Sequence, residues 1–249
     1  AQCLVGSEMC IRDSFDYVKN SCADEESFLQ EYMCAPADDS AGFLGCDCIS
    51  RCLYRPEDGD WRAPAGGANP LFLGVDVGRS RDLSVFWMLE RVGDTLYTRG
   101  ISALENVPFS QQEAELHRFL RLPNLRRALI DQSGLGRQFA ERAAERYGSA
   151  RVGGVTFTAG AKESLAYPLK ARFEDAKIRI PDDIEIIADI RSVRREVGAG
   201  GALRFCAERT SDGHADRFWA LALAVAAADG AKSGAGMELL EKEAPRLVW

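Results

Sequence analysis

The sequence predicts an α/β fold built on one mixed β-sheet flanked by helices. Two observations lead to this prediction. Residues 71–104 contain three closely spaced apolar segments joined by short polar breaks, as in an antiparallel meander. The residues that follow alternate strand patterns with helix patterns, and such strand–helix units add their strands in parallel. The chain has 249 residues, enough for one domain of this kind with an extension.

The first three predicted strands form the meander. Residues 71–78 are apolar almost throughout, which is typical of a strand buried on both faces. Residues 84–92 and 95–104 follow as the second and third strands, with Gly93 and Asp94 as the turn between them. We expect these strands to lie antiparallel in chain order.

The remaining elements alternate between helix and strand. Helical spacing of apolar residues predicts helices over residues 110–122, 134–147, 164–175, 184–196 and from about 214 to 228. Short apolar runs between the helices predict strands over residues 126–131, 151–158 and 203–206. Three antiparallel strands followed by strand–helix units is the order of a ribonuclease-H-like fold.

The predicted domain covers residues 69–230, and the rest of the chain falls into three segments. Residues 1–14 resemble a translated sequencing adapter, so we expect them to be non-native and outside the fold. Residues 15–68 form an acidic connector that ends in a stretch rich in Pro, Gly and Ala, which is typical of a linker. Residues 231–249 form a C-terminal tail.

The net charge of −7 does not exclude a nucleic-acid partner. Residues 1–68 contain 5 basic and 13 acidic groups, whereas residues 69–230 contain 23 basic and 22 acidic groups. Of those 23 basic residues 20 are Arg, whose planar guanidinium suits bidentate contacts with phosphate. No apolar run is long enough to span a membrane, and the first 30 residues lack a signal-peptide pattern. We therefore expect neither membrane insertion nor secretion.

Seven of the eight cysteines lie within the first 52 residues. Disulfide frameworks belong to small secreted domains, so we expect reduced thiols here. Cys46, Cys48 and Cys52, with Cys34 upstream, could instead hold zinc. The cluster contains no C-x2-C pair and has no His nearby, which is unusual for a zinc site.

Three aspartates have positions that suit metal binding. Asp76 ends the first buried strand, and Asp131 ends a strand that should lie beside it at the centre of the sheet. Asp216 lies on the final helix. Carboxylates brought together in this way form a site for Mg²⁺ or Mn²⁺, and two such ions can activate a water and stabilise the leaving oxygen in phosphodiester hydrolysis. Without metal the carboxylates would repel one another, and some would stay protonated.

Two further aspartates are candidate metal ligands. Asp82 precedes the second strand and could either bind metal or cap the turn. Asp212 lies four residues before Asp216, so the two share a helix face if the helix begins early enough. For any single aspartate a turn or capping role is the simpler explanation, but Asp76 and Asp131 together favour a functional site.

Basic side chains near these aspartates are candidates for contacts with DNA phosphates. They are Arg79, Arg81, Arg137, Lys162, Lys170, Arg209 and Arg217. Exposed helices normally carry Arg as well, so the set is more informative than any one member. The chain has no G-x-x-x-x-G-K-[ST] motif, and we therefore expect no ATP site of that kind.

Three separated segments resemble the C-terminal nuclease domain of phage terminase large subunits, most of all the Mu-like and prophage group. They are FLGVDVGRSRDLSVFWMLE, ALIDQSGLGRQFAE and DGHADRFWALALA, in the order that the family has them. The segment ESFLQEYMC also resembles the part of that family that joins its ATPase to its nuclease. The resemblance covers about residues 15–230.

The resemblance implies a metal-dependent endonuclease that cuts concatemeric viral DNA during genome packaging, by attack of metal-activated water on the phosphodiester. It implies that Asp76, Asp131 and Asp216 are catalytic and hold two ions, Mg²⁺ or Mn²⁺. The implied partners are double-stranded DNA, a portal, a small terminase subunit and an N-terminal ATPase domain that is missing from this sequence. The implied location is the host cytoplasm.

Three other functions stay open at this point. The turn from Gly74 to Gly78 is similar to the opening of actin-like and sugar-kinase phosphotransferases, although the second phosphate loop and the adenosine-binding Gly pair of that class are missing. A nuclease similar to Holliday-junction resolvases would share the fold and the chemistry, but the connector and the last-helix motif favour terminase. A catalytically silent module that docks on a portal or on DNA would not need the three aspartates.

Overall fold

The computed structural model describes residues 42–62, 67–78, 83–134, 136–197, 203–207 and 215–233. Five predicted site residues lie outside this part of the chain: Arg79, Arg81, Asp82, Arg209 and Asp212. The predictions for residues 1–41, which include Cys34, and for the C-terminal tail beyond residue 233 also lie outside it.

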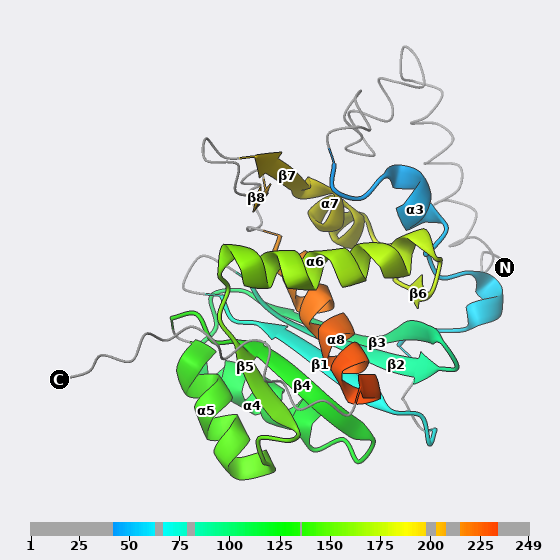
Figure 1. The fold of residues 1–249 in the computed structure, drawn as a ribbon. Coiled ribbons are helices and arrows are strands. Elements are labelled where there is room, and N and C mark those ends of the chain that lie inside the picture. The colour runs from blue at the N-terminus through cyan, green and yellow to red at the C-terminus, as the bar shows by residue number, and fades with distance from the viewer. Residues whose placement is uncertain are drawn as a thin grey trace, which may run out of the picture. The chain divides into compact units, whose positions relative to one another are not determined.

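A six-stranded mixed sheet in the order β5-β4-β1-β2-β3-β6 lies at the centre (Figure 1). The strands are β1 (Leu71–Asp76), β2 (Ser84–Val92), β3 (Thr95–Leu104), β4 (Leu125–Asp131), β5 (Val152–Val155) and β6 (Ile178–Arg179). The first three are antiparallel, as the meander predicts. β4 adds parallel to β1, β5 parallel to β4, and β6 parallel to β3. The predicted ribonuclease-H-like mixed sheet is therefore confirmed.

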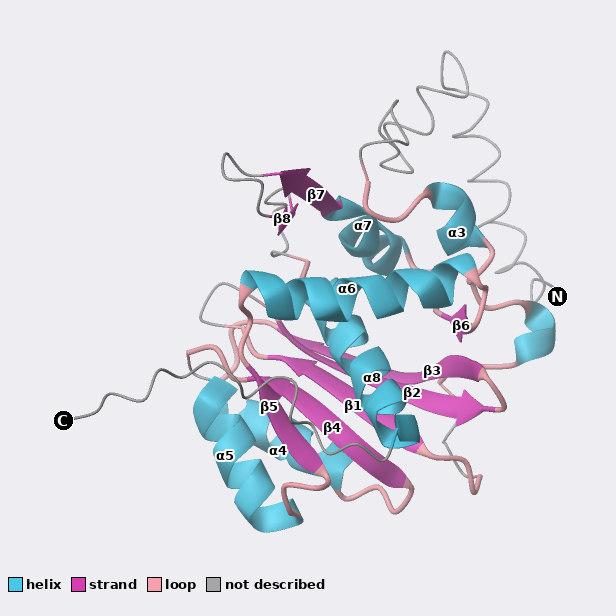
Figure 2. Ribbon diagram, in the orientation of Figure 1, coloured by secondary structure: helices cyan, strands magenta, loops and turns pink. Residues whose placement is uncertain are grey.

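Helices cover both faces of the sheet (Figure 2). They are α3 (Cys46–Ser50), α4 (Phe109–Leu120), α5 (Gly136–Tyr147), α6 (Ala159–Glu174), α7 (Ile184–Ser192) and α8 (Asp216–Ser233), with a short 3-10 helix, η1 (Pro56–Asp58). On one face α8 lies against β1, β2 and β4, and α6 packs on α8. On the other face α4 and α5 pack on the same strands. No described helix is both long and apolar enough to cross a membrane.

The first strand is buried on both faces, in agreement with its apolar run. Leu71, Leu73 and Val75 face the core under α4 and α5, whereas Phe72 faces the core under α8. Gly74 also lies on the α8 side, and a Cβ atom there would be only 2.0 Å from the carbonyl oxygen of an α8 residue. The missing side chain therefore lets the backbone of α8 lie directly on β1.

The predicted helix over residues 184–196 is wrong over residues 193–196. Instead α7 ends at Ser192, and β7 (Val193–Val197) pairs antiparallel with β8 (Leu203–Ala207). A β-branched residue at each end of this segment favours a strand once a partner strand is available. The partner is the predicted strand over 203–206, for which the sequence analysis predicted no neighbouring strand.

Other boundaries differ for local reasons. α6 begins at Ala159 rather than at residue 164, because the hydroxyl of Thr158 accepts a hydrogen bond from the Ala161 N–H and caps the helix there. The final helix begins at Asp216 rather than near residue 214, so the early start that would put Asp212 and Asp216 on one helix face does not occur. α3 and β6 were not predicted, since elements of five and two residues are too short to leave a periodic pattern.

Part of the predicted connector contributes to the core of the domain. Four of its side chains are at most 5% exposed and pack with α6 and α7: Phe43, Leu44, Ile49 and Cys52. The backbone of Ile180 donates to the Cys52 carbonyl at 2.9 Å and accepts from the Tyr54 N–H at 2.9 Å. Residues 43–54 are thus joined to the sheet domain by both apolar packing and backbone hydrogen bonds.

We expect a chain that begins at residue 57 to be much less stable than one that begins at residue 42. The shorter chain lacks four buried apolar side chains, a loss on the order of 5 kcal/mol in the free energy of unfolding. Urea unfolding of the two fragments measures the difference. Equal midpoints would show that the segment docks without stabilising the domain.

Candidate metal and active site

Asp76, Asp131 and Asp216 line a single pocket of about 320 Å³. β1 and β4 are parallel neighbours, so their last residues, Asp76 and Asp131, come to the same edge of the sheet. α8 lies across these strands and contributes Asp216 as its first residue. The fold therefore brings together the three aspartates singled out in the sequence, from two strands and one helix.

Local hydrogen bonds hold two of these carboxylates in place. The Ser133 N–H donates to Oδ1 of Asp131 at 2.9 Å, and the Ser133 hydroxyl accepts from the Phe157 N–H at 3.1 Å. The Leu83 N–H donates to Oδ2 of Asp216 at 3.1 Å, which joins the start of α8 to the start of β2. Backbone N–H groups therefore help to orient both carboxylates.

Burial and mutual repulsion make the pocket unfavourable for several negative charges. Burial, followed by the charges of Asp216 and Asp131, raises the pKa of Asp76 well above its ordinary value. Burial also raises the pKa of Asp131, although its hydrogen bonds from Ser133 oppose the shift. The three residues are only 5–8% exposed. A cation in the pocket would relieve this penalty.

The donor set fits a hard divalent cation, because all three side chains offer carboxylate oxygens. As the described side chains stand, no three His, Cys, Asp or Glu converge tightly enough to form a metal-ligating group. Like charges repel, so a carboxylate set is expected to close further around an ion. What the structure shows is the shared pocket and the charge that an ion would balance.

Lys162 is the predicted DNA-binding residue that lines this pocket. It lies on α6, with its Nζ 4.6 Å from the ring centroid of Trp219 and 5.3 Å from that of Phe157. Both rings also line the pocket, so cation–π contacts hold the ammonium group at its wall. The positive charge of Lys162 lowers the pKa of both Asp76 and Asp131, against the effect of burial.

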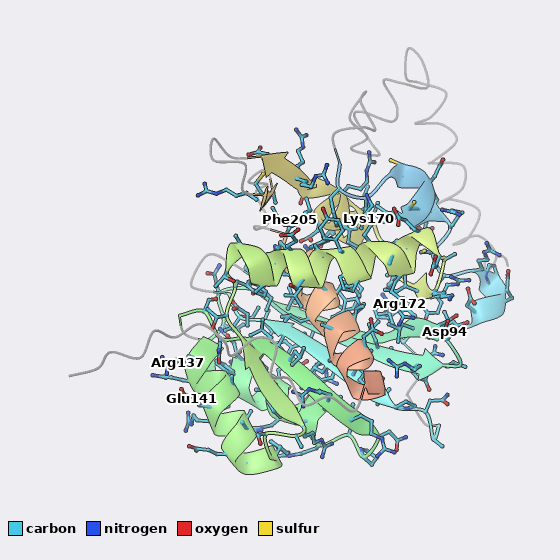
Figure 3. All side chains as sticks on the ribbon, in the orientation of Figure 1. Asp94, Arg137, Glu141, Lys170, Arg172 and Phe205 are labelled. Carbon is cyan, nitrogen blue, oxygen red and sulfur yellow. The ribbon has the colours of Figure 1, made fainter. Side chains whose placement is uncertain are left out.

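The other described basic candidates do not line the pocket. Arg137 is 73% exposed on α5 and pairs with Glu141 at 2.8 Å (Figure 3). Lys170, also labelled in Figure 3, donates to the Phe43 carbonyl at 3.0 Å. Arg217 is buried and donates to a carboxylate oxygen of α7 at 2.6 Å. The last two side chains therefore join parts of the protein to one another.

Asp189, on α7, is a site-related residue that the sequence analysis missed. Its side chain is 8% exposed and accepts hydrogen bonds from the N–H groups of Arg217 and Phe218, at the start of α8. Burial raises its pKa to about 6. The negative charge of Asp189 also contributes to raising the pKa of Asp76. The sequence predicted its helix, but an aspartate on a helix gives no sign that it faces another helix end.

We expect the metal-free protein to become more stable as the pH falls from about 8 to about 5. Burial raises the pKa of Asp76, Asp131 and Asp189 in the folded state, so the folded protein binds protons at a pH where the unfolded chain has released them. For Asp189 alone, a pKa of about 6 instead of 3.8 corresponds to on the order of 2–3 kcal/mol. Urea unfolding in EDTA measures this, and stability that rises toward pH 8 would contradict it.

The alternative of a zinc site at Cys46, Cys48 and Cys52 gains no support from the described residues. No metal-ligating group of His, Cys, Asp or Glu is found among the described side chains. Cys52 is buried and its thiol donates to the Phe173 carbonyl at 3.5 Å. Burial raises the pKa of Cys52 to about 11, which disfavours the thiolate that zinc needs. Its observed role is packing.

The chain is similar to terminases in sequence. Residues 73–228, more than half of the chain, match the family described as "Terminase RNaseH-like domain". The Mu-like prophage FluMu protein gp28 of Haemophilus influenzae is 36% identical over 118 residues. That match covers 47% of this chain and 23% of gp28, so the chain corresponds to less than a quarter of that relative.

Solved structures share the fold. The large terminase nuclease of thermophilic phage G20c, solved with magnesium, is 24% identical with a TM-score of 0.53, over 64% of this chain and 81% of that one. The large terminase of bacteriophage HK97 is 12% identical with a TM-score of 0.54, over 74% of this chain and 43% of that one. The family match includes all three pocket aspartates, and the solved terminase structures share the arrangement of sheet and helices. This chain therefore belongs to the terminase RNase H-like domain family.

Proposed function

We propose that this chain is the metal-dependent DNA endonuclease domain of a phage terminase large subunit, which cuts concatemeric viral DNA during genome packaging. The observation that carries the proposal is the single pocket that the buried residues Asp76, Asp131 and Asp216 share. Family membership supports it, as do the terminase nucleases of phage G20c that were solved with bound magnesium and with bound cobalt.

The three aspartates would hold Mg²⁺ or Mn²⁺, as two ions, and the pair Asp82 and Asp212 are proposed as further ligands. The bound ions would supply an activated water and charge stabilisation for the leaving oxygen of the phosphodiester. The backbone N–H groups of Ser133 and Leu83 orient the carboxylates of Asp131 and Asp216. Because these donors are backbone groups of turns next to the sheet, the fold restricts the positions of these two carboxylates before an ion binds.

Lys162 is the side chain that we assign to the DNA backbone at the pocket. Its Nζ contacts two aromatic rings, so less rotamer freedom is lost when it contacts a phosphate. Arg79 and Arg81 follow Gly78, which lines the pocket, and they are proposed to contact phosphates farther along the strand. Arg137 is exposed and therefore available to DNA in the same way.

Three other predicted DNA contacts have a weaker basis. Arg209 is proposed from its place before α8 in the sequence alone. Lys170 and Arg217 are also proposed to contact DNA. Each would first have to break its present hydrogen bond inside the protein.

The proposed partners are double-stranded DNA, a portal, a small terminase subunit and an ATPase domain, in the cytoplasm of the host. They follow from the family, since the pocket itself bears only on the cutting reaction. No ATP site is proposed for this chain.

Plasmid cleavage by the 249-residue chain with Mg²⁺, Mn²⁺ or EDTA tests the proposed activity. We expect cutting that needs a divalent ion and stops in EDTA. Asp131→Asn should not cut, whereas Asp175→Asn, which changes an exposed aspartate that does not line the pocket, should cut as the unaltered chain does. A folded chain that cuts with neither ion would contradict a self-contained nuclease and favour the docking module.

A further inference from the structure

The first turn of α8 is capped by a side chain from another helix. The first N–H groups of a helix lack partners within it and need acceptors from outside. The residue before α8 is Ala215, which has φ of 62° and no side-chain acceptor. Its carbonyl accepts from the Trp219 N–H at 3.1 Å. Asp189 of α7 accepts from the two N–H groups that precede Trp219. Its Oδ1 lies 2.9 Å from the Phe218 N, and its Oδ2 lies 3.3 Å from the Arg217 N.

This cap lies directly beside a pocket aspartate without belonging to the pocket. Asp216 is the first residue of α8 and the neighbour of Arg217, whereas Asp189 does not line the pocket. The Leu83 N–H bonds the Asp216 carboxylate from the side of β2. Asp216 is therefore fixed by two anchors, one on its carboxylate and one on the backbone of the turn that carries it.

The side chain of Arg217 adds a second link to α7. It donates to Glu185 at 2.6 Å and lies 3.9 Å from Asp189, four residues farther along the same helix. Glu185 is 65% exposed, whereas Asp189 is 8% exposed. A carboxylate as deeply buried as Asp189 is unfavourable unless specific donors hold it, and those donors are the start of α8. Glu185 thus offers a matched control that contacts Arg217 but does not cap the helix.

We propose that Asp189 is a positioning residue that fixes the first turn of α8 and thereby holds Asp216 where it can share a cation with Asp76 and Asp131. This inference rests on the proposed metal site. Without the cap, the first turn of α8 frays and the Asp216 carboxylate samples positions away from the other two. Groups that orient a metal ligand in this way typically contribute about 10–100-fold to metal affinity.

Calorimetric titration of the full chain with Mn²⁺ tests the proposal, together with hydrogen exchange of the Arg217 and Phe218 amides. For Asp189→Ala we expect the Kd for Mn²⁺ to rise about tenfold or more, and both amides to exchange faster. Asp189→Asn keeps the volume and one acceptor oxygen, so it should fall between Ala and the unaltered chain and gives a result even where Ala unfolds. Glu185→Gln should keep the Kd unchanged.

DNA cutting gives a further readout that a purely structural role would not move. In Asp189→Asn the Mn²⁺ concentration for half-maximal cutting should rise, while the rate at saturating Mn²⁺ largely recovers. A lower melting temperature with an unchanged Kd for Mn²⁺ would overturn the proposal, and so would unchanged exchange of the two amides. If the unaltered chain itself neither binds Mn²⁺ nor cuts DNA, the proposed function fails first, and the positioning role fails with it.

Discussion

Asp76→Asn should lower metal-dependent DNA cutting by at least about a hundredfold, because loss of a direct ligand should exceed the ~10–100-fold effect of losing a group behind one. The amide has nearly the shape of the carboxyl group, so the end of β1 keeps its packing. What it loses is the negative charge that a divalent ion needs. Initial rates of plasmid cleavage at saturating Mn²⁺ measure the effect.

The same substitution should increase the stability of the metal-free protein at neutral pH. Burial and the charges of Asp216 and Asp131 hold the pKa of Asp76 high, so removing its charge relieves repulsion in the pocket. Activity and stability are therefore expected to change in opposite directions, which separates loss of the site from loss of the fold. A variant that cuts DNA at the normal rate, or that melts lower in EDTA, would refute this assignment of Asp76.

Gly74→Ala should destabilise the protein by about 3 kcal/mol and also lower cutting activity. A Cβ atom at this position would lie 2.0 Å from the Ala220 carbonyl oxygen and 2.4 Å from the Ala224 N. Both are backbone atoms, so no side chain can rotate away and α8 must move off β1. Because Asp216 begins α8, the movement also displaces a carboxylate of the pocket.

Gly160→Ala is the matched control for that variant. Gly160 lies in the first turn of α6, and a Cβ atom there would meet nothing within 4 Å. Ala is the better helix former, so we expect unchanged or slightly higher stability. Urea unfolding gives both values. Equal unfolding midpoints for the Gly74→Ala and Gly160→Ala variants would show that α8 does not depend on contact with β1.

Much of the sheet is readable from local pattern. The strands over 84–92 and 95–104 have the predicted bounds, because apolar segments with β-branched and aromatic residues and a Gly-Asp turn are local signals. Residues 193–196 were predicted as helix and form a strand, because the strand depends on pairing with residues 203–207. The contribution of residues 43–54 to the core was missed for the same reason, since a short apolar segment shows its partner only in the folded chain.

The sequence by itself predicted that Asp76 and Asp131 would lie close together, because each ends an apolar strand and the strand order places both at one edge of the sheet. Only the tertiary structure decided which groups orient the pocket carboxylates and which basic side chain lies beside them. Two aromatic rings contact the Lys162 ammonium group at the wall of the pocket. Asp189, on α7, accepts hydrogen bonds from the first turn of α8. Periodicity records which face of an element is buried, whereas the contacts of that face depend on elements distant in the chain.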